Sequence, residues 1–206
     1  MRQRIIEGAL KIFIQQGIKA TTMDDIAKQL GISKRTIYEQ FQDKRELLLM
    51  VVEHAHTQSK KDDRDIFVSS QNSLEGFLKL MKKKRSEFNL KLMKMVVELK
   101  RYYPEIIDMK RKHSAEALET LEKIFIKGIE EGVFRADLNP KTSAFLFSTQ
   151  AHLFFTEQLN KMDLSSLDNT DISPLQVFED LFLNFLRGIS TQKGIKIIEK
   201  YMSNTI

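Results

Sequence analysis

The sequence predicts an all-α protein, and three observations support that prediction. Its 206 residues include only 3 Pro and 8 Gly, too few to supply the frequent chain breaks of an all-β protein. Leu, Lys, Ile and Glu are the commonest residues, and these are mostly good helix formers. Apolar residues also recur at the spacing i, i+3, i+4, i+7, which places them on one face of a helix. The hydrophobic fraction of 42% is enough for a buried core beneath these helices.

The first expected helix covers residues 4–16, and Gly17 ends it because glycine adopts positive φ at low cost. Its apolar stripe consists of Ile6, Ala9, Leu10 and Phe13. The second expected helix begins after Thr22, whose hydroxyl caps it while Asp25 reaches back as the other half of a capping box. Its stripe consists of Met23, Ile26, Ala27 and Leu30. Gly31 then ends this short helix.

A third, very short helix comes next, with Ser33 as its N-cap. Ile37 and Phe41 form its inner face. A second capping pair, Asp43 and Glu46, predicts the start of a longer fourth helix. Two short helices joined by a glycine-containing turn are the helix-turn-helix arrangement.

The chain divides into two expected domains. Residues 1–56 hold the first four helices and form a small helix-turn-helix bundle, with the fourth helix bridging to the second domain. The polar segment 57–73 is interpreted as a frayed helix end or a connection, and the domain junction is placed there. Residues 57–206 form the second, all-helical domain. Its expected helices cover residues 74–88, 90–102, 104–131, 139–161, 174–188 and 191–202.

Composition excludes several classes of protein. The absence of Cys excludes disulfides, thiolate metal sites and a Cys nucleophile, and it fits an intracellular protein. The sequence lacks any run of about 18 apolar residues, so we expect no membrane span. The formal net charge of +5 and the pI near 9.2 permit nucleic-acid binding without requiring it, because binding depends on where the positive charge lies on the surface.

An enzyme is disfavoured by the motifs. The sequence contains no Gly-rich phosphate loop, zinc motif or nucleophile elbow. His54 and His56, two residues apart, face different sides of a helix and are poor ligands for one metal. We therefore expect neither a catalytic site nor a bound metal or cofactor.

The N-terminal pattern resembles a known family. Residues of different type stand at fixed spacing, without gaps, over about the first quarter of the chain. They are Phe13, Gly17, Thr21–Thr22, Asp25–Ala27, Leu30–Ser33, Thr36–Tyr38, Phe41, Asp43–Lys44 and Leu47. Together they resemble the DNA-binding domain of the TetR family of bacterial transcriptional regulators. The segment Glu131–Asp137 also resembles the turn before the eighth helix of such proteins.

This resemblance implies a cytoplasmic, all-helical homodimer. Its N-terminal three-helix domain would bind double-stranded operator DNA, and its C-terminal domain would sense a small-molecule effector and dimerise. In the family, the last two long helices of each subunit usually pack as a four-helix bundle across a two-fold axis. The corresponding helices here cover residues 139–161 and 174–188.

The third helix has a polar face suited to DNA. Because Ile37 and Phe41 face inward, 100° per residue puts Arg35, Thr36 and Glu39 on the opposite face. An α-helix fits the major groove, and its N-terminal residues approach the base edges. The alternative interpretation of this face is an ordinary solvated helix surface.

Individual side chains suggest specific partners. Arg35 suits guanine O6 and N7, Gln40 suits adenine or a phosphate, and the Tyr38 hydroxyl suits a phosphate oxygen. Lys44 and Thr22 stand at helix starts, where a phosphate is favoured. Carrying over the contacts of the family gives Thr22, Ser33, Lys34, Thr36, Tyr38 and Lys44. Arg35 departs from the family, in which this position is usually small. We expect it to pair with Glu39 in the free protein and to contribute sequence preference on DNA.

Met and aromatic residues favour either an adaptable apolar pocket or ordinary core packing. The candidate ligand residues are Met93, Tyr102, Phe147 and His152. Core packing is the favoured interpretation for each Met and Phe, a helix-junction cap for Tyr102, and a hydrogen-bonded core or interface position for His152. The basic run 82–85 wraps around a helix and is interpreted as solvated surface rather than a second nucleic-acid patch.

The predicted function is ligand-responsive repression by a homodimer that binds a palindromic operator and is released by a small molecule. One alternative is an activator or a regulator without a ligand. An alternative from another class is an interaction module whose helix-turn-helix packs only against protein.

Overall fold

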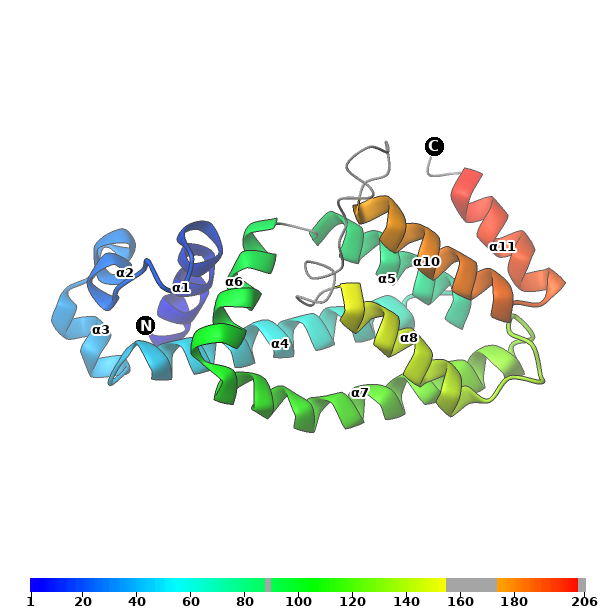
Figure 1. The fold of residues 1–206 in the computed structure, drawn as a ribbon, viewed down its shortest axis with the longest axis horizontal. Helices are drawn as coiled ribbons and strands as arrows, with labels where there is room; N and C mark the ends of the chain where they lie inside the picture. Colours follow the sequence, from blue (N-terminus) through cyan, green and yellow to red (C-terminus); the bar gives the residue numbers. More distant parts are fainter. Residues whose placement is uncertain (88–89, 155–173, 204–206) are drawn as a thin grey trace. The chain divides into compact units, whose positions relative to one another are not determined.

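The computed structural model describes residues 1–87, 90–154 and 174–203, and their secondary structure is helical (Figure 1). The helices are α1 (Arg2–Gln16), α2 (Met23–Leu30), α3 (Lys34–Gln40), α4 (Lys44–Val68), α5 (Ser73–Glu87), α6 (Leu90–Tyr102), α7 (Pro104–Glu130), α8 (Pro140–Phe154), α10 (Pro174–Ile189) and α11 (Gln192–Ser203). Within these ranges the exception is an isolated antiparallel bridge between Phe134 and Ser190. The all-α prediction is confirmed. Among the described residues, none of the helices combines the length and apolarity needed to cross a bilayer.

The helices form two compact units. The N-terminal unit consists of the chain up to Asp62 together with α6 and the first turns of α7, up to Lys110. The C-terminal unit contains the end of α4, then α5, the rest of α7, α8, α10 and α11. The N-terminal unit exceeds the domain predicted at residues 1–56 because α6 packs against α1 and buries Met95 and Leu99 in the same core.

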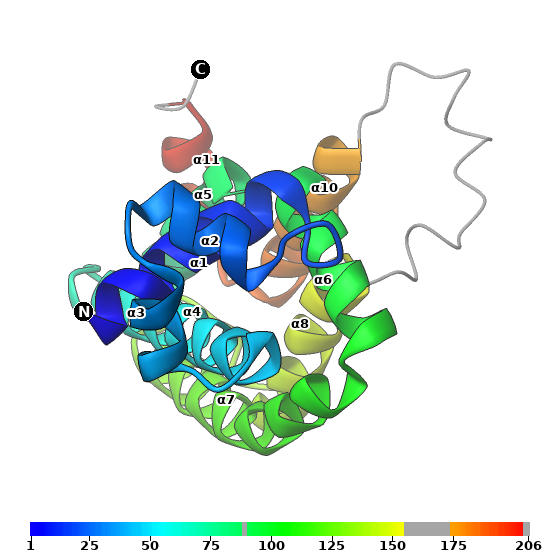
Figure 2. The same cartoon turned by 90° about the vertical axis from the view of Figure 1, so that its left-hand side faces the viewer.

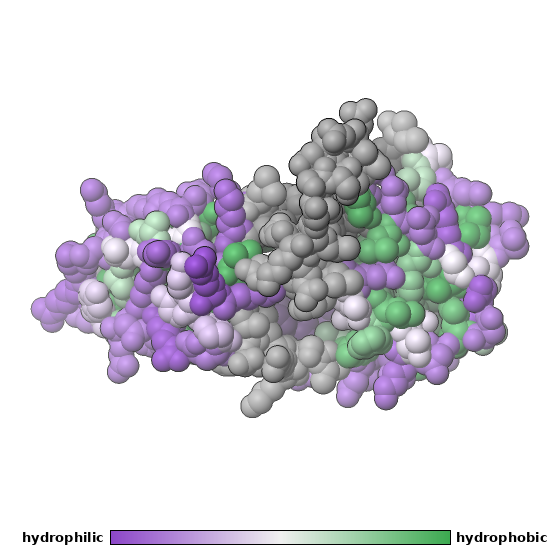
Figure 3. Space-filling view, in the orientation of Figure 1, coloured by the Kyte–Doolittle hydropathy of each residue, from purple (hydrophilic) through white to green (hydrophobic). Residues whose placement is uncertain are grey.

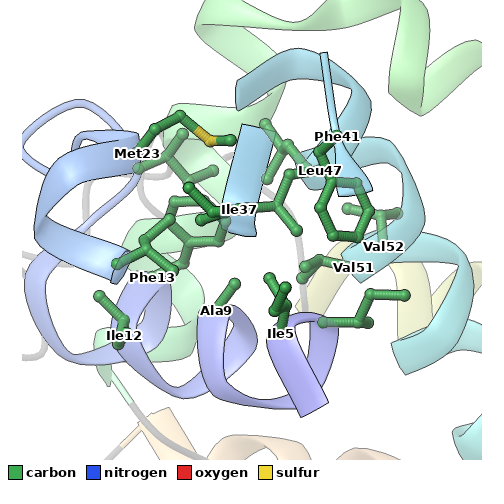
Figure 4. Packing of buried hydrophobic residues seen from close by; sticks show 14 of the residues in the cluster. Ile5, Ala9, Ile12, Phe13, Met23, Ile37, Phe41, Leu47, Val51 and Val52 are labelled. Atoms are coloured by element: carbon green, nitrogen blue, oxygen red, sulfur yellow. The ribbon is translucent and has the colours of Figure 1, made fainter. Parts of the chain in front are cut away.

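Mostly aliphatic side chains from α1 to α4 fill the core of the N-terminal unit (Figure 4). The side chains that meet there include Ile5, Ala9, Ile12, Phe13, Met23, Ile37, Phe41, Leu47, Val51 and Val52. Ile37 and Phe41 are both buried, as the sequence predicts. They fix the rotation of α3 about its own axis, so its opposite face is turned to solvent.

Two glycines help to shape the helix-turn-helix. Gly8 on α1 leaves room for the side chain of Leu30, because a Cβ there would lie 2.4 Å from Leu30 Cδ2. Gly31 has φ 63°, which other residues adopt only with strain. Its N–H donates to the carbonyl oxygens of Ala27 and Lys28 and so ends α2. The predicted turn between the two short helices is confirmed.

Helix α4 is longer than the sequence suggested. The segment predicted as a frayed end or connection continues as helix to Val68. Up to Val68 it is polar but contains neither Gly nor Pro, so no helix-breaking residue ends the helix earlier. A hydrogen bond from Gln58 Nε2 to Asp62 Oδ1, 2.8 Å long and one turn apart, supports it.

Phenylalanine rings dominate the core of the C-terminal unit. The ring of Phe77 on α5 lies 5.0 Å from that of Phe125 on α7 and 4.7 Å from that of Phe147 on α8, between centroids. Phe134 lies 5.5 Å from Phe125, and Phe182 on α10 lies 4.9 Å from Phe147. Aromatic pairs of this kind contribute about 0.5–1.5 kcal/mol beyond area burial. The ring cluster therefore joins α5, α7, α8 and α10.

The turn after α7 is held by the segment between α10 and α11. Thr191 donates its N–H to the Val133 carbonyl at 3.0 Å and its hydroxyl to the Gly132 carbonyl at 2.8 Å. The same hydroxyl accepts the N–H of Gly194 at 3.2 Å and so caps α11. A Cβ on Gly194 would lie 2.4 Å from the Val133 oxygen, so α11 starts in direct contact with this turn.

Candidate nucleic-acid interface

The start of α2 is organised by the predicted capping box. The Thr22 hydroxyl accepts the N–H of Asp25 at 3.1 Å, and Asp25 Oδ2 accepts the Thr22 N–H at 2.9 Å and the Thr22 hydroxyl at 2.6 Å. These bonds favour the carboxylate and lower the pKa of Asp25. The N–H and the hydroxyl of Thr22 are thus both directed at Asp25 in this structure. A phosphate contact by the Thr22 hydroxyl would require it to turn away from the carboxylate.

Helix α3 has seven residues and packs beside α2 (Figure 2). Ser33 caps its start: the Ser33 hydroxyl accepts the N–H of Thr36 at 3.0 Å and lies 2.8 Å from its hydroxyl oxygen. Ile37 is fully buried. Arg35 and Glu39 are exposed on the other side, as the helical spacing predicts.

The exposed cations of α3 are paired with acids in the free protein. Arg35 Nε lies 2.8 Å from Glu39 Oε1, so the pairing expected from the sequence is present. Lys34 forms an ion pair with Asp24, and that hydrogen bond raises the pKa of Lys34. Both pairs are exposed, and such pairs stabilise a fold only weakly. DNA groups can therefore replace these carboxylates at low cost.

The starts of α2, α3 and α4 converge. Asp24, in the first turn of α2, pairs with Lys34, the first residue of α3. Asp25, beside it, acts electrostatically on Lys44, the first residue of α4. Helix starts carry partial positive charge and N–H groups without partners inside the helix, which together favour an anion.

Tyr38 and Lys44 are the candidate phosphate anchors. The Tyr38 side chain is 51% exposed, and its hydroxyl has no hydrogen-bond partner among the described residues. Lys44 is half-buried, and burial lowers the pKa of its ammonium, an effect that Glu98 and Asp25 oppose. An added phosphate would act in the same direction as these two carboxylates and favour the charged ammonium.

The C-terminal end of α3 is less suited to a phosphate. An open hollow of about 380 Å³ there is lined by Tyr38, Glu39, Gln40, Phe41, Gln42 and Glu46. Two carboxylates and the negative end of the helix would repel a phosphate. Of the two partners predicted for Gln40, this charge favours a base over a phosphate.

Sequence reasoning missed two residues that organise this unit, Arg2 and Glu98. Glu98 on α6 accepts the N–H of Lys19 at 2.9 Å, which fixes the loop before α2. Arg2 Nη2 lies 3.0 Å from Glu46 Oε1 at the start of α4. These partners are 79 and 44 residues apart in the chain, so no local pattern signals them.

The candidate ligand residues have different surroundings. Phe147 is buried in the ring cluster of the C-terminal unit. Tyr102 belongs to the N-terminal unit, is exposed, and has the Lys19 ammonium 5.5 Å from its ring centroid. The side chains of Met93 and His152 lie outside the described residues. Phe147 and Tyr102 belong to different units, and the ligand pocket stays a prediction.

Three residues of the basic run 82–85 form ion pairs. Lys83 and Lys84 lie 2.8 Å and 3.3 Å from Asp63 Oδ1, and Arg85 lies 2.8 Å from Glu179. These pairs argue against a second nucleic-acid patch, but Lys83 and Lys84 are half-buried rather than fully solvated.

Comparison with known sequences matches the N-terminal helices. The family model described as "Bacterial regulatory proteins, tetR family" matches residues 5–51. An uncharacterized HTH-type transcriptional regulator of Bacillus subtilis (strain 168), YvaF, is 34% identical over 104 residues, which are 50% of this chain and 54% of that protein. An HTH-type transcriptional regulator of Staphylococcus aureus (strain USA300) is 40% identical over 68 residues, 33% of this chain and 32% of that protein. The chain thus spans between a third and about half of the length of these relatives.

Solved structures resemble most of the chain. A putative transcriptional regulator from Saccharomonospora viridis in complex with choline has a TM-score of 0.73 at 18% identity, over 93% of this chain and 98% of that one. A TetR-family regulator from Cytophaga hutchinsonii has a TM-score of 0.69 at 19% identity, over 93% and 95%. The ketosteroid transcriptional regulator KstR2 of Mycobacterium tuberculosis has a TM-score of 0.60 at 21% identity, over 93% and 95%. At this identity the likeness shows the fold, an N-terminal helix-turn-helix followed by a helical C-terminal region.

Proposed function

We propose a function from the premise that the chain belongs to the TetR family of helix-turn-helix transcriptional regulators. The protein binds double-stranded DNA in the bacterial cytoplasm and regulates transcription, and it is not an enzyme. The convergence of the starts of α2, α3 and α4 carries this proposal. It combines an anion-binding surface with a recognition helix, α3, whose outer face is polar and exposed.

The proposed contacts divide by role. Tyr38 and Lys44 bind phosphates and set the register of the protein on the duplex. Lys34 and Thr36 lie at the start of the recognition helix and enter the major groove. Arg35 releases Glu39 and binds a guanine. The remaining proposed contacts are those of Thr22, Ser33 and Gln40.

An exposed apolar face on α8 and α10 supports a homodimer. Phe145 and Leu146 on α8 and Leu181 on α10 are exposed. Figure 3 shows hydrophobic surface over these two helices, which contact each other. They are the helices predicted to pair across a two-fold axis. A two-fold dimer through this face presents two recognition helices to a palindromic operator.

The proposed effector is a small apolar molecule that binds in the C-terminal unit and releases the DNA. The rings of Phe77, Phe125 and Phe147 contact one another, so a ligand that enters between them must separate them and shift their helices. Linkage requires operator DNA to weaken effector binding by the same factor. Release by an effector makes the protein a repressor. An activator or a ligand-independent regulator is the alternative within this class, and a protein-interaction module is the alternative outside it.

A gel-shift experiment with DNA from upstream of the gene of this protein, at several salt concentrations, tests DNA binding. We expect retardation at low salt that weakens as salt rises, because bound phosphates release counterions. An absence of retardation at low salt would contradict the regulator function and favour the interaction module.

A further inference from the structure

The first turn of α1 contacts the ends of both helices of the helix-turn-helix. Arg4 Nη2 donates to the carbonyl of Leu30, the last residue of α2, at 3.0 Å. Arg2 Nη1 donates to the carbonyl of Gln40, the last residue of α3. Two arginines that are two residues apart therefore each hold the C-terminal end of one helix.

These contacts satisfy groups that helices leave open. The last carbonyls of a helix have no partner within it and carry partial negative charge, so a guanidinium is favoured there. Helix α2 already ends at a left-handed Gly31. Helix α3 has no glycine at its end: its C-cap is Phe41, with extended backbone. At seven residues it is also too short to be stable alone, so it depends more on its arginine.

Arg2 makes two further contacts. Its guanidinium carbon lies 4.3 Å from the centroid of the Phe41 ring, a cation–π distance, and Nη2 lies 3.0 Å from Glu46 Oε1. Glu46 Oε2 also accepts the N–H of Gln42 at 2.8 Å. One side chain thus ties the end of α3 to the first turns of α1 and α4.

We propose that Arg2 and Arg4 form an arginine clamp that sets the angle of the recognition helix against α2, and that they act on DNA recognition as positioning residues. The proposal rests on the DNA-binding function above. Both guanidinium groups already bond protein acceptors, so their role is distinct from that of a phosphate anchor. A recognition helix with a loose end loses base contacts that depend on its angle, while phosphate contacts persist.

The test compares Arg2→Ala and Arg4→Ala with Lys11→Ala, which removes the same charge from an exposed position on α1. Binding is measured for a duplex that the wild-type protein selects from a random library and for poly(dI-dC), across salt concentrations. We expect Arg2→Ala to weaken binding to the selected duplex about tenfold and to poly(dI-dC) less than twofold, with an unchanged salt slope. Arg4→Ala acts in the same direction but less, Arg2→Lys recovers part of the loss, and Lys11→Ala leaves the ratio of the two affinities unchanged.

A second measurement needs no DNA. In the free Arg2→Ala protein, amide hydrogen exchange of Ile37 and Phe41, whose N–H groups bond within and at the end of α3, should accelerate at least tenfold while α1 amides keep their protection. Unchanged exchange in α3 would overturn the clamp. So would an equal loss for both DNAs with a salt slope reduced by about 0.9 per chain, since Arg2 would then be a phosphate contact. If wild type selects no duplex, the DNA-binding proposal fails, while the exchange experiment still decides the clamp.

Discussion

The two units differ in which kinds of side chain they bury and which they expose. The N-terminal unit has a mostly aliphatic core, and its distinctive residues, such as Tyr38, Lys34 and Arg35, are exposed. The C-terminal unit has a phenylalanine cluster inside, and on α8 and α10 it exposes apolar side chains. A surface that binds DNA needs particular polar groups at fixed spacing, whereas a core or a self-association face needs only apolar volume. This difference explains why candidate DNA-binding residues can be identified in the sequence, whereas pocket or interface residues cannot be told from core residues.

The largest expected effect concerns the ring cluster. Phe125 is fully buried and lies within 5.5 Å of Phe77 and Phe134, between ring centroids. Phe125→Ala should cost about 3–5 kcal/mol of unfolding free energy, through lost burial and the cavity left behind. The control is Ile126→Ala, the next residue on α7, which is exposed. Urea unfolding followed by circular dichroism measures both, and equal losses would mean that the cluster does not carry the stability of this unit.

The next effect concerns the exposed apolar face. Phe145→Asp puts a charge on α8 at a side chain that is 57% exposed, and it should raise the dimer dissociation constant at least tenfold, or about 1.4 kcal/mol. Val68→Asp makes the same change at another exposed apolar position in the C-terminal unit. Sedimentation velocity over a range of concentrations separates the two. A dimer that persists in Phe145→Asp, or that Val68→Asp disrupts equally, argues against this interface.

A smaller effect on stability is expected from removing one helix N-cap in each unit. Thr22→Ala removes the capping box of α2 and should destabilise the N-terminal unit by about 1 kcal/mol, whereas Thr22→Ser keeps the hydroxyl and should cost much less. Thr191→Ala removes the cap of α11 and should act on the C-terminal unit instead. Amide exchange resolved by residue shows which unit loosens. Loosening of both units by either change would show that they are not separate.

The smallest effect is the dependence on pH, which differs in sign between the units. Hydrogen bonds with Thr22 lower the pKa of Asp25 below its ordinary 3.8, so this carboxylate contributes stability above that value that is lost as pH falls through the lowered pKa. Burial raises the pKa of Tyr201 above its ordinary 10.0, with Glu75 adding to it, so this phenol contributes stability below pH 10 that is lost as pH rises through the raised pKa.

Two variants check this contrast. Asp25→Asn should reduce the loss of stability of the N-terminal unit as pH falls. Tyr201→Phe should reduce the loss of stability of the C-terminal unit as pH rises. Backbone amide signals of each unit, followed by NMR against pH and urea, measure the pH dependence of the two stabilities separately. If neither variant changes that dependence, these two groups do not determine how the stability of either unit varies with pH.

Local patterns predict most of the fold but not its long-range contacts. The caps at Thr22 and Ser33 and the turn at Gly31 are predictable because each involves residues within four positions of one another. The continuation of α4 to Val68 is not predicted, because polarity alone indicates a helix end although no breaking residue stands there. The packing of α6 against α1 is not predicted either, because these helices are far apart in the chain.

The same limit applies to the candidate site. Helical spacing identifies the outward face of α3, including the Arg35–Glu39 pair, four residues apart. It gives no sign that Glu98 contacts the loop before α2, or that Arg2 contacts the end of α3, because these partners meet only in the folded chain. The pocket residues are weaker candidates for a different reason: an apolar side chain such as Phe147 has the same sequence signature in a core as in a binding site.

The central claim is that DNA phosphates bind where the starts of α2, α3 and α4 converge in the N-terminal unit. The most direct test is the slope of log affinity against log salt for the selected duplex, in Lys44→Ala and in Lys82→Ala, an exposed lysine of the C-terminal unit. We predict that Lys44→Ala reduces the steepness of the slope by about 0.9 for each chain bound and that Lys82→Ala leaves it unchanged. An unchanged slope in Lys44→Ala, or a reduced one in Lys82→Ala, would contradict this claim.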